Sequence, residues 1–232
     1  MNPDLERDGF SIVPDVLREA ERREWIERLG PVLGAVRRGL LSLPAVAELA
    51  RSHRLLDLAR PHLPMEPLPV RAIYFDKSPE ANWLVPWHQD LTLALQSRAE
   101  IPGYGPWSVK DGIPHVQPPV KVLRQMLTIR LHLDDAGESN GALRVLPGSH
   151  SLGRLPPERI RELRTQRPEF VCRVAAGDAL LMRPLLLHAS GRSTSAGHRR
   201  VLHIEYAGFA LPGELAWHES DQRIVSVPPS TG

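Results

Sequence analysis

The chain has 232 residues, of which 42% are hydrophobic and 24% charged, as in an ordinary globular protein. Its 29 Lys and Arg residues nearly balance 27 Asp and Glu residues, and they are scattered, so nucleic-acid binding is not indicated. The chain has no run of about 18 apolar residues, so no membrane span is predicted. A charged amino terminus and one cysteine, Cys172, favour a cytoplasmic protein in which Cys172 is a core thiol. The length suits a single domain over residues 1–232; the oligomeric state stays open.

The first third of the chain predicts one short strand followed by helices. Residues 9–14 are typical of a strand, and Asp15 is placed to cap a helix over about 17–29. Apolar residues then recur at helical spacing: Leu40, Leu41, Val46, Leu49, Leu55, Leu56 and Leu58. The helices, over about residues 15–62, therefore offer an apolar face that can cover a sheet.

From about residue 70 to residue 210 the pattern is that of strands. Two segments, 127–133 and 199–206, alternate between an apolar and a polar side. The polar sides carry Thr128, Arg130 and His132 in one segment and Arg199, His203 and Glu205 in the other. An ordinary sheet with a solvated polar face explains such strands one at a time. A barrel whose interior holds a charged ligand is the alternative, because buried polar groups need partners.

A candidate metal site lies in the run Val85-Pro86-Trp87-His88-Gln89-Asp90. Residues i and i+2 of a strand share a face, so His88 and Asp90 can point at one ion. His188 offers a third ligand, and two imidazoles with one carboxylate suit non-haem Fe(II) with open coordination positions. The triplet alone is a weak signal, because His-x-Asp also occurs among packed residues.

Residues 95–122 form a long excursion rich in Pro and Gly directly after this pair. A loop in that position suggests a lid over the site. Its possible substrate contacts are Trp107, Lys110 and His115. The alternative is a surface insertion that folds back on itself.

Further motifs follow in a fixed order. They are Asn140-Gly141-Ala142-Leu143, Leu146-Pro147-Gly148-Ser149-His150, Gly177-Asp178, the distal His188, and Arg199 eleven residues after it. With the His-x-Asp pair, this ordered set resembles the phytanoyl-CoA dioxygenase family of Fe(II)- and 2-oxoglutarate-dependent oxygenases, over about residues 8–210. The resemblance implies a mainly β, cupin-like jelly roll (a double-stranded β-helix) with the N-terminal helices packed on one sheet.

The resemblance also implies roles for single residues. His88, Asp90 and His188 hold the iron, Arg199 binds the distal carboxylate of 2-oxoglutarate, and Ser190 assists. A guanidinium suits that task because its planar, permanently charged fork pairs with both carboxylate oxygens. Arg199 and Arg200 point to opposite faces of a strand; parity with the polar face selects Arg199, whereas a register error of one residue would select Arg200.

Other inward-facing residues are second-tier candidates. Thr128 and Arg130 share a face and are candidates for contacting 2-oxoglutarate or the substrate, although Arg130 can equally well pair with Glu205 or Asp90 inside the barrel. His132 and His203 also face inward, as substrate contacts or as neighbours of the metal ligands. A further motif residue, His150, is expected to be structural, as are Gly141, Pro147 and Gly148.

The expected activity is hydroxylation of a small molecule, in which 2-oxoglutarate and O2 yield succinate and CO2. Relatives that halogenate have a small residue at the position of Asp90, so the retained carboxylate favours hydroxylation. Two other classes stay open: a cupin-like metalloenzyme that does not use 2-oxoglutarate, and a non-catalytic jelly-roll binding protein. A carboxylate anchor at Arg199 separates the 2-oxoglutarate-dependent oxygenase from the cupin-like metalloenzyme, which does not need one. The sequence does not name the substrate.

Overall fold

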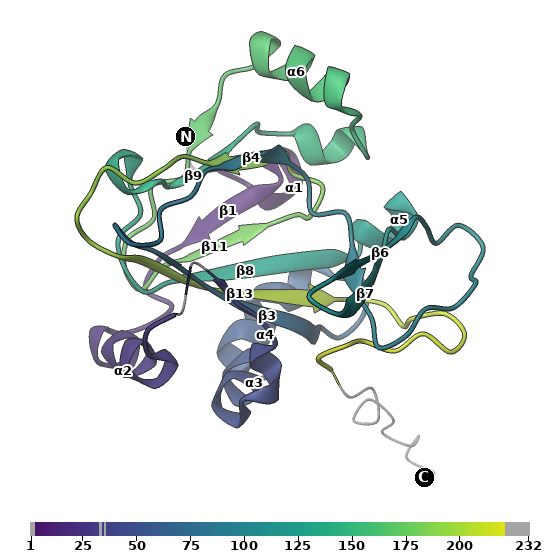
Figure 1. Ribbon diagram of the computed structural model, residues 1–232, viewed down its shortest axis with the longest axis horizontal. Helices are drawn as coiled ribbons and strands as arrows, with labels where there is room; N and C mark the ends of the chain where they lie inside the picture. The colour runs from purple at the N-terminus through teal and green to yellow at the C-terminus, as the bar shows by residue number, and fades with distance from the viewer. Residues whose placement is uncertain (1–2, 33, 35, 221–232) are drawn as a thin grey trace.

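Two antiparallel sheets face each other at the centre of the protein, as seen in a computed structural model that describes residues 3–32, 34 and 36–220 (Figure 1). In order, the larger sheet contains β1 (Phe10–Val13), β11 (Ala179–Met182), β8 (Met126–His132), β13 (Arg199–Ala207), β3 (Leu68–Lys77) and β2 (Val36–Arg37). The smaller sheet contains β10 (Phe170–Val171), β9 (Leu143–Val145), β12 (His188–Ser190) and β4 (Val85–His88). The predicted jelly roll is therefore confirmed.

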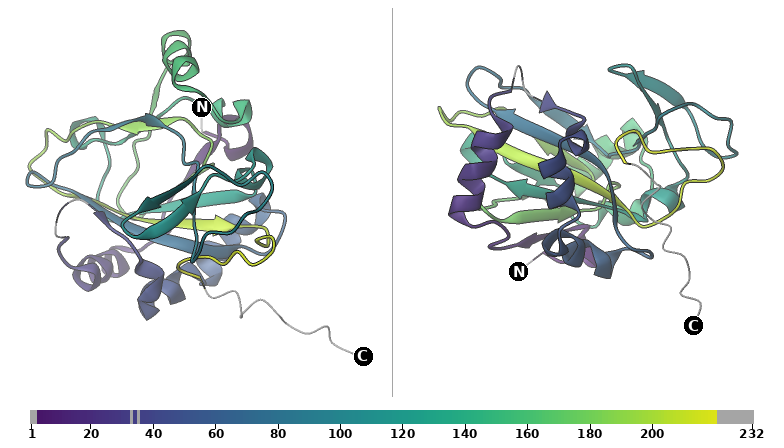
Figure 2. Two further views of the ribbon diagram at one scale, coloured as in Figure 1. Left: turned by 45° about the vertical axis from the view of Figure 1, so that its right-hand side comes forward. Right: turned by 90° about the horizontal axis from the view of Figure 1, so that it is seen from below.

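Helices cover the outer face of the larger sheet (Figure 2). They are mainly α2 (Glu19–Leu29), α3 (Pro44–Ala50) and α4 (His53–Ala59). The helix α6 (Pro157–Gln166) and short helical segments complete the fold: α1 (Leu5–Asp8), η1 (Leu40–Ser42), η2 (Arg60–His62), α5 (Val120–Leu123), η3 (Glu138–Asn140) and η4 (Ser149–Leu152). No helix in the described ranges is long and apolar enough to cross a membrane.

One predicted helix boundary is wrong. Asp15 does not cap α2; its backbone lies in the left-handed region, with φ 56°, and its N–H donates to the Asp178 side chain at 3.0 Å. The cap position belongs to Arg18, whose backbone N–H donates to the Glu21 carboxylate at 2.8 Å. The side chain of Asp178, just before β11 (Ala179–Met182), thus binds the backbone of Asp15, which does not form the helix cap that the sequence suggested.

The alternation of β8 and β13 is fully expressed in the packing. Six outward side chains have no exposed surface and join the helices in one apolar cluster: Leu127, Ile129, Leu131, Leu202, Ile204 and Tyr206. The hydroxyl of Tyr206 also donates to the carbonyl of Ala50 in α3 at 2.9 Å. Burying this face commits the opposite, polar face to the space between the two sheets.

The segment over residues 95–122 is more ordered than a simple loop. Strands β6 (Trp107–Lys110) and β7 (Ile113–Val116) form a hairpin, and β7 also pairs with β5 (Leu93–Ala94). Leu93, Val116 and Trp217 belong to a separate apolar cluster beneath it. Figure 2 shows the hairpin, in teal, projecting beside the two main sheets. Its role as a lid stays a prediction.

The register of the larger sheet arranges its inward side chains in rows. Arg199 stands opposite Lys77 at one end of the β13–β3 pair, and Glu205 stands opposite Arg71 towards the other end. Between them, His203 of β13 lies opposite Arg130 of β8. Six residues of extended strand separate the two outer rows, roughly 20 Å along the sheet. The pocket described below therefore has two chemically distinct ends.

Candidate metal centre and its pocket

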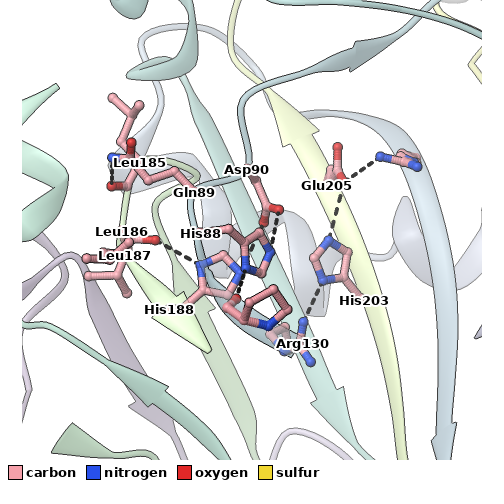
Figure 3. A network of polar contacts seen from close by, with 12 residues as sticks. His88, Gln89, Asp90, Arg130, Leu185, Leu186, Leu187, His188, His203 and Glu205 are labelled. Atoms are coloured by element: carbon pink, nitrogen blue, oxygen red, sulfur yellow. Dashed lines mark hydrogen bonds and ion pairs between the residues drawn. The ribbon is translucent and has the colours of Figure 1, made fainter. Parts of the chain in front are cut away.

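Three candidate metal ligands, two imidazoles and one carboxylate, converge between the sheets. His88 ends β4 and His188 begins β12, and these two residues are direct register partners in the smaller sheet. Their ring centroids lie 4.2 Å apart. Asp90 follows two residues after His88, and one donor atom from each of the three residues lies within 4.8 Å of the others (Figure 3). The pairing of β4 with β12 thus brings together residues that are far apart in sequence.

Backbone carbonyls fix the tautomers of both histidines. Nδ1 of His88 lies 2.8 Å from the carbonyl oxygen of Pro86, and Nδ1 of His188 lies 2.8 Å from that of Leu186. A carbonyl can only accept, so each Nδ1 carries the proton and each Nε2 keeps its lone pair. Both Nε2 atoms lie 3.7 Å from the Asp90 carboxylate. This is the arrangement in which imidazoles are oriented towards a metal.

The residue between the two β4-end ligands holds this turn in place. The Gln89 side chain is buried and donates to the carbonyls of Leu185 at 2.7 Å and Gly153 at 2.8 Å. Its oxygen accepts from the N–H of Leu155 at 2.8 Å. In addition, the backbone N–H of Asp90 donates to the carbonyl of Pro184, at 2.9 Å. The ligands are therefore pre-positioned by hydrogen bonds that need no metal.

The ionisation of the cluster also suits a divalent cation. Burial lowers the pKa of His188 to about 4, against the attraction of Asp90, so this imidazole is neutral at pH 7. Burial works to raise the pKa of Asp90, but His188, His203 and other nearby cationic or titratable groups outweigh it and hold the pKa below its usual value. A neutral imidazole and an ionised carboxylate are the forms that bind a metal.

Arg199 and Ser190 line one end of the pocket, and Lys77, which lies outside the lining, contacts Ser190 there. Lys77 has no exposed surface and Arg199 is 3% exposed. The Lys77 ammonium donates to the Ser190 hydroxyl at 2.7 Å and to the carbonyl of Gly191, and it lies 5.0 Å from the ring centroid of Trp83. In the described chain, neither cation forms an ion pair with a carboxylate. Two buried cations without a counter-charge destabilise the folded protein unless an anionic ligand binds beside them.

Burial and neighbouring cations lower the pKa of both Lys77 and Arg199. Burial, together with repulsion by Arg199 and Arg130, lowers the pKa of Lys77 to about 7. Burial and Arg130 lower the pKa of Arg199 to about 10. Arg199 thus stays charged at neutral pH, whereas Lys77 is poised to gain a proton when an anion binds.

Sequence reasoning missed Lys77. The sequence predicts strands from about residue 70 but does not mark Lys77 as a site residue, whereas β3 runs from Leu68 to Lys77 and ends with it. Parity along β3 was the available signal, since Lys77 shares the inward face with Phe75 and Arg71. Gly141, another motif residue, makes room for the ammonium: its φ is 72°, and a Cβ there would lie 3.0 Å from Nζ of Lys77.

The choice between the two adjacent arginines is resolved by their positions. Arg199 lines the pocket. Arg200 points to the outer face, where its guanidinium donates twice to the Asp134 carboxylate, both at 2.7 Å. A guanidinium already held in such a bidentate pair is not available to a second carboxylate. Of the two adjacent arginines, only Arg199 can therefore face a ligand in the pocket.

A chain of polar contacts runs along the inner face past the metal ligands (Figure 3). Arg130 donates to Nδ1 of His203 at 2.8 Å, so the proton of this imidazole is on Nε2, 3.3 Å from Glu205. Glu205 also accepts from Arg71 at 3.4 Å. Arg130 is thus paired with neutral His203 rather than directly with Glu205 or Asp90. Its charge still acts on Asp90, whose pKa it helps to lower.

The cavity between the sheets has a volume of about 210 Å³. It brings together the following predicted site residues: His88, Asp90, His188, Ser190, Arg199, Arg130 and His203. Thr128 and His132 lie on the inner face but do not line this cavity. Trp107, Lys110 and His115 lie on the β6–β7 hairpin, also outside the lining. Their predicted contacts with a co-substrate or substrate stay predictions.

Unpaired polar atoms show that the cavity wall is incomplete as it stands. Nε of Arg130 and Nε of Arg199 are buried without a hydrogen-bond partner in the described chain. Buried polar atoms are nearly always paired in a finished site. The donor set therefore fits a polar, negatively charged ligand beside a divalent metal. A jelly roll with such a centre belongs to the class of mononuclear non-haem metal enzymes.

Comparison with known proteins gives this class a family. The phytanoyl-CoA dioxygenase (PhyH) family matches residues 5–201, and the chain belongs to that family. The predicted resemblance is confirmed, and the protein is an Fe(II)- and 2-oxoglutarate-dependent oxygenase. No curated protein sequence matches it significantly.

Solved structures share the fold. AviO1 from Streptomyces viridochromogenes Tue57 is 26% identical, with a TM-score of 0.64 over 90% of this chain and 94% of AviO1. HygX from Streptomyces hygroscopicus, solved with nickel and 2-oxoglutarate, is 20% identical, with a TM-score of 0.62 over 88% and 84% of the two chains. EctD from S. alaskensis, solved with 2-oxoglutarate and 5-hydroxyectoine, is 20% identical, with a TM-score of 0.68 over 88% and 73%.

Proposed function

We propose that the protein hydroxylates a C–H bond of a small molecule, with His88, Asp90 and His188 as the iron ligands and 2-oxoglutarate held in the adjoining cationic end of the pocket. The observation that carries the proposal is the convergence of the three donor atoms within 4.8 Å, next to buried cations that form no ion pair with a carboxylate of the described residues. Bound Fe(II), together with O2 and 2-oxoglutarate, supplies the oxidation that turns C–H into C–OH while releasing succinate and CO2.

The histidines and Asp90 prepare the metal site before the metal arrives. The two Nδ1–H groups are held by backbone carbonyls, so both Nε2 lone pairs face the Asp90 carboxylate. Two neutral imidazoles and one carboxylate leave positions open for further ligands. Because Asp90 occupies one ligand position, no room is left there for a halide, and this favours hydroxylation over halogenation.

Arg199, Lys77 and Ser190 hold the distal carboxylate of 2-oxoglutarate in this proposal. A carboxylate placed between Arg199 and Lys77 would neutralise both cations and give the Nε of Arg199 a partner. The Ser190 hydroxyl lies 2.7 Å from the Lys77 ammonium and is positioned to share the same anion. A metalloenzyme that works without 2-oxoglutarate has no use for this pair of buried charges, and a mere binding protein has no use for the ligand triad.

The test is turnover of 2-oxoglutarate by the purified protein with Fe(II), ascorbate and O2. Slow formation of succinate is expected even without a substrate, because that step needs only the metal and 2-oxoglutarate sites. Binding of iron with no succinate formed under any of these conditions contradicts the proposal. Screening metabolites for faster succinate formation then identifies the substrate.

A further inference from the structure

The pocket has a second cationic region, at the end away from Lys77 and Arg199. It consists of Arg38, which directly follows β2, and Arg71 in β3; both line the cavity. The pairing of β2 with β3 places Val36 opposite Phe75, so Arg38, two residues on, shares the inward face. Arg38 is exposed, whereas the Arg71 side chain is only 14% exposed. The region thus spans the rim and the wall of the pocket.

The charges of the cavity do not balance once its cofactors are present. Four guanidinium groups line it (Arg38, Arg71, Arg130 and Arg199), against the carboxylates of Asp90 and Glu205 in the lining and that of Asp111, which pairs with Arg38. Fe(II) and the dianion of 2-oxoglutarate cancel each other, so the loaded pocket keeps an excess of positive charge. Excess charge in a partly buried site is unfavourable and attracts the opposite charge. The remaining occupant, the substrate, is the group that can supply it.

The partners of the arginines show where that negative charge belongs. Arg199 faces the proposed 2-oxoglutarate site, while Arg130 and Arg71 belong to the hydrogen-bonded chain through His203 and Glu205. Arg38 has a different kind of partner: Asp111, at 3.1 Å, at the tip of the β6–β7 hairpin. The two side chains are 45% and 67% exposed, so this ion pair is weak and exchangeable.

We propose that the substrate is a small organic anion whose carboxylate or phosphate group displaces Asp111 from Arg38, with Arg71 beside it. The proposal rests on the proposed function of the same pocket. The lining of the cavity also has an apolar part, formed by Ile73, Phe75, Val85 and Leu143. An apolar body lies along this part with its reactive C–H bond towards His88 and Asp90. Because 2-oxoglutarate shares the 210 Å³ cavity, the charged end of the substrate reaches the rim.

The test measures binding to the holoenzyme loaded with Fe(II) and saturating 2-oxoglutarate, without oxygen, by calorimetry. The probes are 3-phenylpropanoate, its uncharged amide, and phenyl phosphate, which separates a carboxylate preference from a phosphate preference. At least one anion should bind about 10-fold more tightly than the amide, and the preference should shrink as salt is added.

Two neighbouring arginines give a matched pair of variants. Arg38→Gln should abolish the preference for the anion. Arg37→Gln removes the adjacent guanidinium, whose side chain points away and donates to the carbonyl of Leu29, and should keep the preference. Asp111→Asn frees Arg38 from its competitor and should tighten the binding of the anion about 3-fold.

The proposal is overturned if neither anion binds more tightly than the amide to the unmodified enzyme, which includes binding of none of the three. It is also overturned if Arg38→Gln keeps the preference. Formation of succinate by the unmodified enzyme without a substrate reports on the proposed function separately. An oxygenase with basal turnover but no preference for anions would leave the proposed function intact while refuting the anionic substrate.

Discussion

The two ends of the pocket use the same kind of charge in opposite ways. At the closed end, Lys77 and Arg199 are buried and pair with no carboxylate in the described part of the chain, and burial lowers the pKa of both. At the rim, Arg38 is exposed and pairs with the exposed Asp111. A buried, unneutralised cation demands an anion and binds it strongly, whereas an exposed pair exchanges its partner at little cost. In the two proposals above, 2-oxoglutarate binds at the closed end and the charged group of the substrate binds at the rim.

The largest effect should come from the metal ligands between the two ends. His88→Ala removes an Nε2 donor and should abolish formation of succinate, because the remaining two ligands do not hold iron in place. Iron content and succinate are measured together on the purified variant. Chelation of iron from the unmodified enzyme should have the same effect, reversed by adding Fe(II). Full activity of His88→Ala would remove this residue from the ligand set.

Substitutions at the closed end should weaken the binding of 2-oxoglutarate without loss of iron. Arg199→Ala is expected to raise the Kd for 2-oxoglutarate by roughly 100-fold, since a bidentate charged hydrogen bond is lost. Arg200→Ala is the matched control, because that side chain pairs with Asp134 on the outer face. An unchanged Kd in Arg199→Ala, measured by calorimetry, would exclude Arg199 as the anchor.

Lys77→Met should cause a smaller loss of affinity, about 10-fold, because Arg199 remains. It should also change the pH dependence. The pKa of Lys77 is about 7 without the ligand, so binding of the 2-oxoglutarate dianion draws a proton onto Lys77 at higher pH. Affinity should therefore fall as the pH rises above about 7 in the unmodified enzyme. The same slope in Lys77→Met would assign the proton to another group.

The same substitution separates function from stability. A lysine whose pKa is about 7 in the folded protein, against about 10.5 when exposed, binds fewer protons folded than unfolded between these values. The folded state is therefore penalised most below pH 7, and the penalty fades as the pH rises towards 10.5. Without 2-oxoglutarate, Lys77→Met should have the higher Tm at pH 6.5, by ~2–4 °C, and the gap should narrow at pH 9. Thermal unfolding at the two pH values measures it; a lower Tm at both would contradict the cost assigned to this charge.

The smallest effect on stability belongs to the rim. Asp111→Asn should change the free energy of unfolding by less than about 0.5 kcal/mol, because the ion pair that it breaks is exposed on both sides. Denaturant unfolding measures this value. A loss of several kcal/mol would mean that the Arg38–Asp111 pair holds the hairpin in place, and the contrast between the two ends of the pocket would disappear.

The sequence by itself determined which face each strand presents. The alternation in β8 and β13 predicted the apolar outer face and the polar interior, and parity placed Arg199 inward and Arg200 outward. The spacing of His88 and Asp90 predicted that both point at one site, and they do, although β4 ends at His88 and Asp90 lies beyond it. The ordered motifs led to the family. These features are local, because the period of a strand fixes the direction of a side chain relative to its neighbours in the chain.

Only the tertiary structure decided which distant residues meet. Lys77 lies beside Ser190, which is 113 residues away in sequence, and Arg38 meets the hairpin tip at Asp111. Likewise, the short strand β2 that carries Arg38 into the pocket lies where the sequence predicted helices. These neighbours depend on strand order and register between sheets, which are set by the packing of the whole core and not by any local pattern. The charge balance of the pocket, and with it the inference about the substrate, could be drawn only after the strands were in place.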